Sequence, residues 1–256
     1  MRHTTRLLLL SSLLLSAGLT AHCQEHHAVI LSDTVPQQII YHTGYTVSYN
    51  ADTHTPNWVS WELSKERASA TTVSRSGNDF LPDPQADDGM DTRHYSHSGY
   101  QRGHMCPAAD NKMSETAMRE SFYLTNICPQ DGVLNEGLWN ELEQRCRYLA
   151  KKHGSLTIVC GPVFGADFER IGQKGIGVPQ AFFKAVLGPG NELIGFIMPN
   201  APEDPEKDIF SYAVPVDRIE ELTGIDLFPE LPDSIEDKAE KSFDKQFWEI
   251  RNWKKK

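Results

Sequence analysis

Alternating apolar and polar positions predict several strands along the chain. Residues 58–64, WVSWELS, alternate in this way and predict a strand. Residues 121–128, SFYLTNIC, are rich in β-branched and aromatic side chains and predict a second strand, which Pro129 should end. Further strands are expected at residues 47–49, 156–164, 181–188 and 193–199, the last two forming a pair.

A helical repeat of apolar residues follows the second strand, at residues 133–153. Its apolar positions recur at steps of four and three, namely Leu134, Leu138, Leu142, Cys146 and Leu149. Gly154 is a favourable helix end. A shorter amphipathic helix is predicted at residues 216–224, and the tail from Glu236 is expected to be helical. Residues 75–99 are rich in Gly, Asp, Pro and Ser, which predicts a long irregular segment.

The N-terminus has the pattern of a secretory signal peptide. Two arginines precede a short apolar run, and polarity returns at His22. We therefore expect a signal peptide at residues 1–23 and an exported protein, periplasmic or extracellular. The alternative is a lipid anchor on Cys23, and no other membrane partner is expected. The rest divides into an N-terminal extension (24–56), one domain (57–232) and a C-terminal helical tail (233–256).

Composition limits the function classes. The chain has 256 residues, of which 39% are hydrophobic and 23% charged, and no linker divides its middle. Its formal net charge of -10 argues against broad electrostatic binding to nucleic acid or anionic lipid, although a local basic cleft remains open. The even number of cysteines after residue 23 suggests disulfides of undetermined pairing, with free buried thiols as the alternative: Cys106, Cys128, Cys146 and Cys160.

A set of polar residues lies around a strand–strand–helix unit. Arg102 and His104 face the same side if residues 100–105 are extended. Asn126 closes the second strand. On an ideal helix Asn135 points along the apolar stripe, and Glu143 lies about 80° to one side, where most helices place packing residues.

Each of these residue types has a chemical use. A neutral imidazole can take a proton from water, and a guanidinium can grip a phosphate with two hydrogen bonds. An asparagine oxygen is a hard ligand suited to magnesium, and a nearby carboxylate can hold one of the metal's waters. Together they favour a phosphodiester hydrolase that uses one metal ion.

Each residue also has a structural interpretation. Asn135 could start a helix, Glu143 could pair with Arg147 four residues on, and Asn126 could bond the turn at Pro129. The joint occurrence of all of them in this order favours the chemical interpretation.

Three segments carry a resemblance to a known family. RGHMCPAAD (102–110), LTNICPQ (124–130) and LNEGLWNELE (134–143) resemble the DNA/RNA non-specific endonuclease family, the ββα-metal nucleases that include secreted bacterial sugar-non-specific nucleases and mitochondrial endonuclease G. The similarity continues to about residue 230. It implies an α+β fold in which a ββα-metal finger sits on a central, mainly antiparallel sheet flanked by helices.

The resemblance also implies roles for individual residues. His104 matches the general base, Asn135 the single protein ligand of Mg²⁺, and Glu143 the carboxylate that acts through the metal's water. Arg102 and Asn126 match residues that support the phosphate and the geometry of the site. Arg75, in SRSGNDFLPDP, matches a second phosphate-contacting arginine.

The implied activity is hydrolysis of DNA and RNA with Mg²⁺, for which Mn²⁺ could substitute. The alternatives are an inactive binding module on the same fold and an exported phosphodiesterase of small substrates. Positive charge could come from Lys112, Arg119, Lys184 and the terminal lysines, Lys254 to Lys256. The family usually has aspartate where this chain has Gln101, and an alternating strand predicts that Gln101 faces away from Arg102 and His104, in a structural role.

Overall fold

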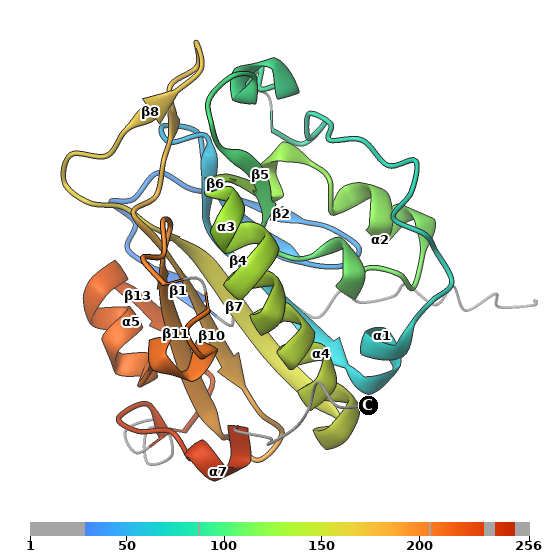
Figure 1. The fold of residues 1–256 in the computed structure, drawn as a ribbon, viewed down its shortest axis with the longest axis vertical. Coiled ribbons are helices and arrows are strands. Elements are labelled where there is room, and N and C mark those ends of the chain that lie inside the picture. Colours follow the sequence, from blue (N-terminus) through green and yellow to red (C-terminus); the bar gives the residue numbers. More distant parts are fainter. Residues whose placement is uncertain (1–28, 87, 205, 233–238, 249–256) are drawn as a thin grey trace, which may run out of the picture.

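A seven-stranded sheet organises the described part of the chain, which comprises residues 29–86, 88–204, 206–232 and 239–248 of a computed structural model (Figure 1). Every neighbouring pair in this sheet is antiparallel. From one edge to the other its strands are β12 (Ala213–Val214), β11 (Leu193–Pro199), β10 (Ala181–Leu187), β7 (Ser155–Val163), β4 (Thr55–Ser64), β3 (Thr46–Asn50) and β2 (Gln38–Tyr41). The α+β class and the mainly antiparallel sheet expected from the sequence are confirmed.

The two faces of the sheet carry different layers because side chains alternate along each strand. On β10, Phe182 points into the core shared with Leu142 of α4 (Asn140–His153), whereas Phe183 points into the core shared with Ile219 of α5 (Val216–Thr223). All four side chains are buried, and burying each stabilises the fold by roughly 1.5–3 kcal/mol. Figure 1 shows α4 lying across β4 and β7, with α5 beside β13 and β1.

The other strands of the described residues form three two-stranded sheets. They are β1 (Val29–Leu31) with β13 (Ile225–Leu227), β5 (Gln101–His104) with β6 (Ile127–Gln130), and β8 (Arg170–Ile171) with β9 (Ile176–Gly177). The N-terminal segment therefore adds β1, β2 and β3, and the boundary expected between residues 56 and 57 falls inside β4.

Short helical segments connect the strands. The remaining α-helices are α1 (Lys65–Ser69), α2 (Glu115–Glu120), α3 (Gly132–Leu134) and α7 (Lys245–Trp248). The 3-10 turns are η1 (Thr92–Tyr95), η2 (Ala108–Asp110), η3 (Leu124–Asn126) and η5 (Ile209–Tyr212). Within the described ranges, no helix combines the length and apolarity needed to cross a membrane.

The strand expected at residues 121–128 is mostly wrong. Residues 124–126 form the turn η3, and the strand begins at Ile127 and continues through Pro129 to Gln130. Pro129 is tolerated because β5 and β6 form a two-stranded ribbon, in which each strand has an edge that needs no N–H donor. The chain before Ile127 follows a different course because it bonds to a distant segment. The Leu124 N–H donates a hydrogen bond to the Leu81 carbonyl.

The helix expected at residues 133–153 is confirmed but is not uniform. Between α3 and α4 it opens into a π-helical turn, η4 (Asn135–Trp139), where Gly137 leaves helical geometry at φ −98° and ψ −107°. The helix ends at Gly154, whose φ of +117° is open to glycine. Because η4 has more residues per turn than an α-helix, the directions of side chains counted at 100° per residue do not hold from α3 to α4.

The strands expected near residues 47–49, 58–64, 156–164, 181–188 and 193–199 are confirmed, as is the helix that ends at Gly224. The disulfides suggested by the sequence are absent from the described residues, because the four cysteines from Cys106 onward are free and buried. The signal peptide, Cys23 and the lysines of the C-terminus lie outside the described residues, as does much of the expected helical tail.

Candidate active site

A cleft of about 390 Å³ opens between the β5–β6 ribbon, the 70–91 segment and the helix that runs from α3 to α4. It brings together Arg75, Arg102, His104, Asn135 and Glu143, and it does not include Asn126. The full lining is Arg75, Gln101, Arg102, His104, Pro107, Ala108, Ala109, Asn135, Glu136, Asn140, Glu143 and Arg147.

His104, at the end of β5, forms part of the apolar wall of the cleft. Its ring lies 5.2 Å from the Phe80 ring and 5.0 Å from the Phe122 ring, and it is 8% exposed. Burial and the charge of Arg75 lower its pKa to about 3, so the imidazole is neutral near pH 7. Its Nε2 is buried and has no hydrogen-bond partner among the described residues.

The chain after His104 is held by Asn126. The Asn126 side chain accepts a hydrogen bond from Cys106 N at 2.9 Å and donates to the carbonyls of Cys106 and Ser121. Trp139 Nε1 donates to the His104 carbonyl at 3.3 Å, which ties β5 to η4. Asn126 is fully buried, so it can influence the cleft only by holding this backbone.

Two arginines line the cleft, and each places its guanidinium over an aromatic ring. The Arg102 guanidinium lies 4.8 Å from the centre of the Phe80 ring, and that of Arg75 lies 5.6 Å from the centre of the Phe122 ring. Within the described part of the chain, neither guanidinium has a hydrogen-bond acceptor. Both sets of donors are therefore available to an anion.

Asn135 and Glu143 supply oxygen atoms on the helix side of the cleft. The Asn135 amide donates from Nδ2 to Gln101 Oε1 at 2.6 Å, which leaves its carbonyl oxygen for another partner. Burial raises the pKa of Glu143 to about 7, against the opposing charges of Lys184 and Arg147. An amide oxygen and a carboxylate beside a water-accessible cleft fit a hard divalent cation such as Mg²⁺.

Gln101 does not face away from the site, and this prediction was wrong. Its side chain lines the cleft and bonds both Asn135 and Glu136. Gln101 is the first residue of a four-residue strand, and its long side chain turns back over Gly132, where a Cβ would come within 3.0 Å of its amide nitrogen. Strand alternation fixes where a Cβ points but not where a flexible amide ends.

Several lining residues were not identified from the sequence. On α4, Asn140, Glu143 and Arg147 follow at steps of three and four, so they lie on one helix face, and this spacing could have revealed Asn140 and Arg147. Arg147 forms an ion pair with buried Asp110 at 2.9 Å. No sequence pattern indicated that Phe80 and Phe122 would enclose His104.

Lys184, which was expected to supply positive charge, is absent from the cleft lining. Lys184 is 1% exposed and lies beneath the cleft, with its ammonium 4.3 Å from the centre of the Trp139 ring. Lys112 and Arg119 are absent from the cleft lining. The cleft instead has three guanidinium groups, from Arg75, Arg102 and Arg147, against the carboxylates of Glu136 and Glu143.

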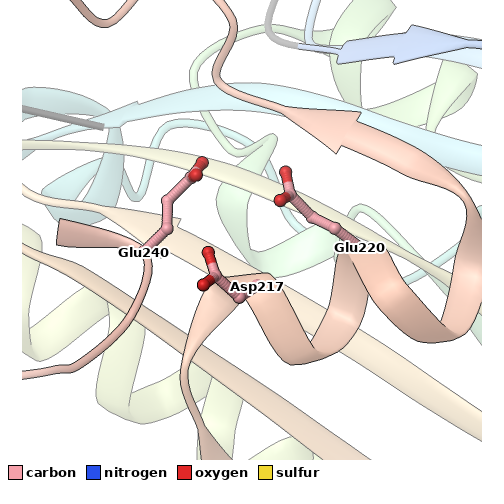
Figure 2. Close-up of side chains that lie close together, drawn as sticks. All are labelled: Asp217, Glu220 and Glu240. Atoms are coloured by element: carbon pink, nitrogen blue, oxygen red, sulfur yellow. The ribbon is translucent and has the colours of Figure 1, made fainter. Parts of the chain in front are cut away.

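A second group of oxygen atoms, here named the acidic cluster, lies on the opposite side of the sheet. Asp217 and Glu220 project from α5, and Glu240 approaches them from the C-terminal segment (Figure 2). Their carboxylate atoms lie within 4.8 Å of one another. We assign no ion to this cluster.

Comparison with known proteins gives a consistent family. The profile of the DNA/RNA non-specific endonuclease family matches residues 24–234. The mitochondrial nuclease of Saccharomyces cerevisiae is 37% identical over 211 residues, and the mitochondrial nuclease EXOG of Danio rerio is 35% identical over 210 residues. These matches take in 73% and 75% of this chain but 64% and 61% of the relatives, so the chain spans less than two thirds of their length.

The fold is also similar to a solved structure. A chain in the crystal structure of the EndoG/EndoGI complex, described as showing the mechanism of EndoG inhibition, superposes with a TM-score of 0.73 at 28% identity. The superposition covers 77% of this chain and 87% of that chain.

The names of these relatives contradict the exported location expected from the N-terminal pattern. The yeast and zebrafish proteins are named mitochondrial, as is the endonuclease G of Caenorhabditis elegans, which is 36% identical over 211 residues. The periplasmic or extracellular expectation is corrected on this ground.

Proposed function

Because the chain belongs to the DNA/RNA non-specific endonuclease family, we propose that its cleft hydrolyses phosphodiester bonds in DNA and RNA with little sequence preference. The observation that carries the proposal is the meeting of a neutral imidazole, free guanidinium donors and an amide–carboxylate pair in one cleft. These groups can activate water, hold a phosphate and bind a cation, which are the three requirements of the reaction.

His104 is proposed as the general base. Its neutral imidazole, which lines the cleft, accepts the proton of a water molecule placed in line with the phosphorus. Phe80 and Phe122 restrict the ring's movement and exclude competing water from its faces. Arg75 and burial keep the imidazole neutral, so it is in the proton-accepting form when substrate arrives.

Asn135 and Glu143 are proposed to hold the metal ion. The Asn135 carbonyl oxygen would bind Mg²⁺ or Mn²⁺ directly, and the Glu143 carboxylate would accept a hydrogen bond from one of its waters. When bound, such an ion stabilises the negative charge of the phosphate and of the leaving 3′-oxygen. Arg147, which pairs with Asp110, places a positive charge near Glu143 and favours its ionised form.

Arg102 and Arg75 are proposed to bind the remaining phosphate oxygens. Their guanidinium groups are oriented by Phe80 and Phe122 rather than by protein acceptors, so a phosphate can take their hydrogen bonds. Asn126 is proposed to act through the backbone after His104. Phosphate contacts carry no base sequence, which accounts for low specificity.

The net charge of -10 restricts how substrate binds. Attraction to nucleic acid must come from the cleft's arginines rather than from the whole surface. We therefore expect binding that weakens steeply as salt is raised, with a slope set by a few phosphate contacts.

Cleavage assays on the full chain test the proposal. Circular plasmid and a single-stranded RNA are incubated with the protein plus Mg²⁺, plus Mn²⁺, or plus chelator, and fragments are followed on gels. We expect both nucleic acids to be cut internally with either metal and neither to be cut with chelator. Binding without cleavage by folded, metal-supplied protein would contradict the proposal in favour of a binding module, and cleavage of mononucleotide esters alone would favour a small-substrate phosphodiesterase.

A further inference from the structure

Gln101 lies between the residue proposed to bind metal and a carboxylate that the proposed mechanism does not use. Its Nε2 donates to Glu136 Oε1 at 2.6 Å, and its Oε1 accepts from Asn135 Nδ2 at 2.6 Å. Gly132 leaves the space that the Gln101 amide occupies, since a Cβ there would lie 3.0 Å from Nε2. We name this chain of contacts, Glu136–Gln101–Asn135, the amide relay.

The carboxylate sets the direction of the whole relay. An ionised carboxylate only accepts hydrogen bonds, so the Gln101 amide must turn its NH₂ toward Glu136 and its carbonyl toward Asn135. The Asn135 amide must then turn its NH₂ toward Gln101. Its carbonyl oxygen is left on the other side, where Asn135 lines the cleft.

The opposite orientation is disfavoured at each step. If the Gln101 amide rotated by half a turn, its carbonyl would face the Glu136 carboxylate, and its NH₂ would face the NH₂ of Asn135. If Asn135 rotated as well, it would present N–H donors to a bound cation. An asparagine alone has no such preference, because its two amide atoms have nearly the same size.

From this geometry we propose that Gln101 is a positioning residue which, oriented by Glu136, holds the Asn135 carbonyl oxygen toward the cleft for a divalent cation. The proposal rests on the proposed function only in taking Asn135 as the metal ligand. It also gives a use to the residue that departs from the family's usual aspartate. An aspartate can accept from an asparagine amide directly, whereas glutamine needs a second group to fix its own direction, and Glu136 provides it.

The first test removes the relay without changing charge. Gln101→Met keeps the side chain's length but cannot accept from Asn135. We expect the dissociation constant for Mn²⁺, measured by titration calorimetry on the full chain without nucleic acid, to rise about tenfold or more. Gln144→Met, on an exposed position of α4 outside the cleft lining, is the matched control and should bind Mn²⁺ as the wild type does. Equal affinity in Gln101→Met and the control would overturn the proposal.

The second test exchanges the two polar groups. Glu136→Gln keeps an acceptor oxygen but adds an NH₂ donor, so position 136 no longer fixes the direction of the Gln101 amide, and we expect Mn²⁺ affinity to fall several-fold. The double variant Gln101→Glu with Glu136→Gln restores an acceptor opposite Asn135 and a donor at 136, so affinity should return to within about twofold of wild type or become tighter. Glu230→Gln, which removes an exposed carboxylate outside the cleft, should have no effect. A double variant as weak as Glu136→Gln alone would contradict the relay.

The third test needs no metal and no activity. Hydrogen exchange of the Asn135 side-chain NH₂ is followed by NMR in chelator, with the resonance assigned through Asn135→Asp. We expect exchange to be slower in the wild type than in Gln101→Met, by at least several-fold, and unchanged in Gln144→Met. Equal exchange rates would overturn the proposal even if the wild type cleaves nucleic acid. Slow exchange in a wild type that neither binds Mn²⁺ nor cleaves would instead support the relay geometry and contradict the proposed function.

Discussion

The cleft and the acidic cluster both gather oxygen atoms that suit a divalent cation, but they surround those atoms differently. In the cleft, Asn135 and Glu143 are accompanied by three arginines and an imidazole. In the acidic cluster, three carboxylates lie together, those of Asp217, Glu220 and Glu240. A phosphodiester is itself an anion, so a group of carboxylates without a bound cation repels it. The comparison teaches that the cleft places guanidinium donors and an imidazole beside its oxygen ligands, as phosphate chemistry requires.

Removing the proposed base should have the largest effect. His104→Ala takes away the proton acceptor in the cleft, and we expect the single-turnover rate of DNA and RNA cleavage to fall by about 10²–10⁴ with Mg²⁺ present. His97→Asn is the control, because His97 is exposed, lies outside the cleft and has a φ of 59°, which asparagine tolerates. Near-ultraviolet circular dichroism checks the fold, and a His104→Ala rate within tenfold of the control would refute the assignment.

The phosphate-binding arginines should come next. Arg75→Ala and Arg102→Ala each remove one guanidinium from the cleft, and we expect kcat/KM for an oligonucleotide to fall by about 10–100-fold, since a charge-assisted hydrogen bond contributes about 1.5–3 kcal/mol. The dependence of binding on salt should also become shallower by about one phosphate contact.

Arg119→Ala provides the comparison for these variants, because Arg119 is exposed on α2 and outside the cleft. If all three variants lose affinity equally and keep the same salt slope, the positive charge acts from the general surface and not from the cleft.

Glu143 should make stability depend on pH in the absence of metal. Its pKa is raised from 4.5 to about 7 in the folded chain, so between these values the folded chain holds a proton that the unfolded chain has lost. Stability from this group is full below the unfolded pKa and declines as the pH rises through about 7. Glu143→Gln has no carboxyl at this position and does not lose this stability. The difference between its free energy of unfolding and that of the wild type should therefore rise by roughly 1–3 kcal/mol between pH 5 and pH 8.

Urea denaturation in chelator at the two pH values measures this change. His104 titrates in both proteins and cancels in the difference. Glu230→Gln, which is exposed, should show a constant offset from wild type. A constant offset for Glu143→Gln as well would mean that its carboxylate is ionised throughout.

Changes in the acidic cluster should have the smallest effect. The double variant Asp217→Asn with Glu220→Gln removes two of its three charges but keeps side-chain shape, including an oxygen for the hydrogen bond that Leu227 N donates to Glu220. We expect the cleavage rate and its Mg²⁺ dependence to stay within about twofold of wild type, with stability changed by less than about 1 kcal/mol. A large loss of Mg²⁺-dependent cleavage would erase the distinction between the two regions.

The elements that carry regular periodicity were predictable from the sequence. α4 and α5 each have one apolar face, and β10 and β11 are nearly continuous apolar runs, so pattern alone located them. The strand expected at 121–128 failed because composition cannot show that the residues before Ile127 bond to the distant segment at Leu81. The cysteines were ambiguous for a similar reason, since an even count says nothing about burial in a core.

The candidate site was predictable in its residue types but not in its connections. His104, Asn135 and Glu143 were found from spacing and resemblance, and the structure places them in one cleft with both arginines. Gln101 was assigned to the wrong side because alternation describes the Cβ direction at a strand end and not the reach of a long amide. The enclosing rings of Phe80 and Phe122 come from segments without periodicity, so only tertiary structure could bring them to His104.

The central claim is that the cation required for cleavage is held in the cleft by Asn135. The most direct measurement compares Asn135→Ala with the double variant Asp217→Asn and Glu220→Gln, recording Mn²⁺ affinity by calorimetry and plasmid cleavage against Mg²⁺ concentration on the same samples. The account predicts that Asn135→Ala loses at least tenfold in affinity together with metal-dependent cleavage, while the double variant keeps both. Cleavage by Asn135→Ala with the wild-type dependence on Mg²⁺ would contradict it.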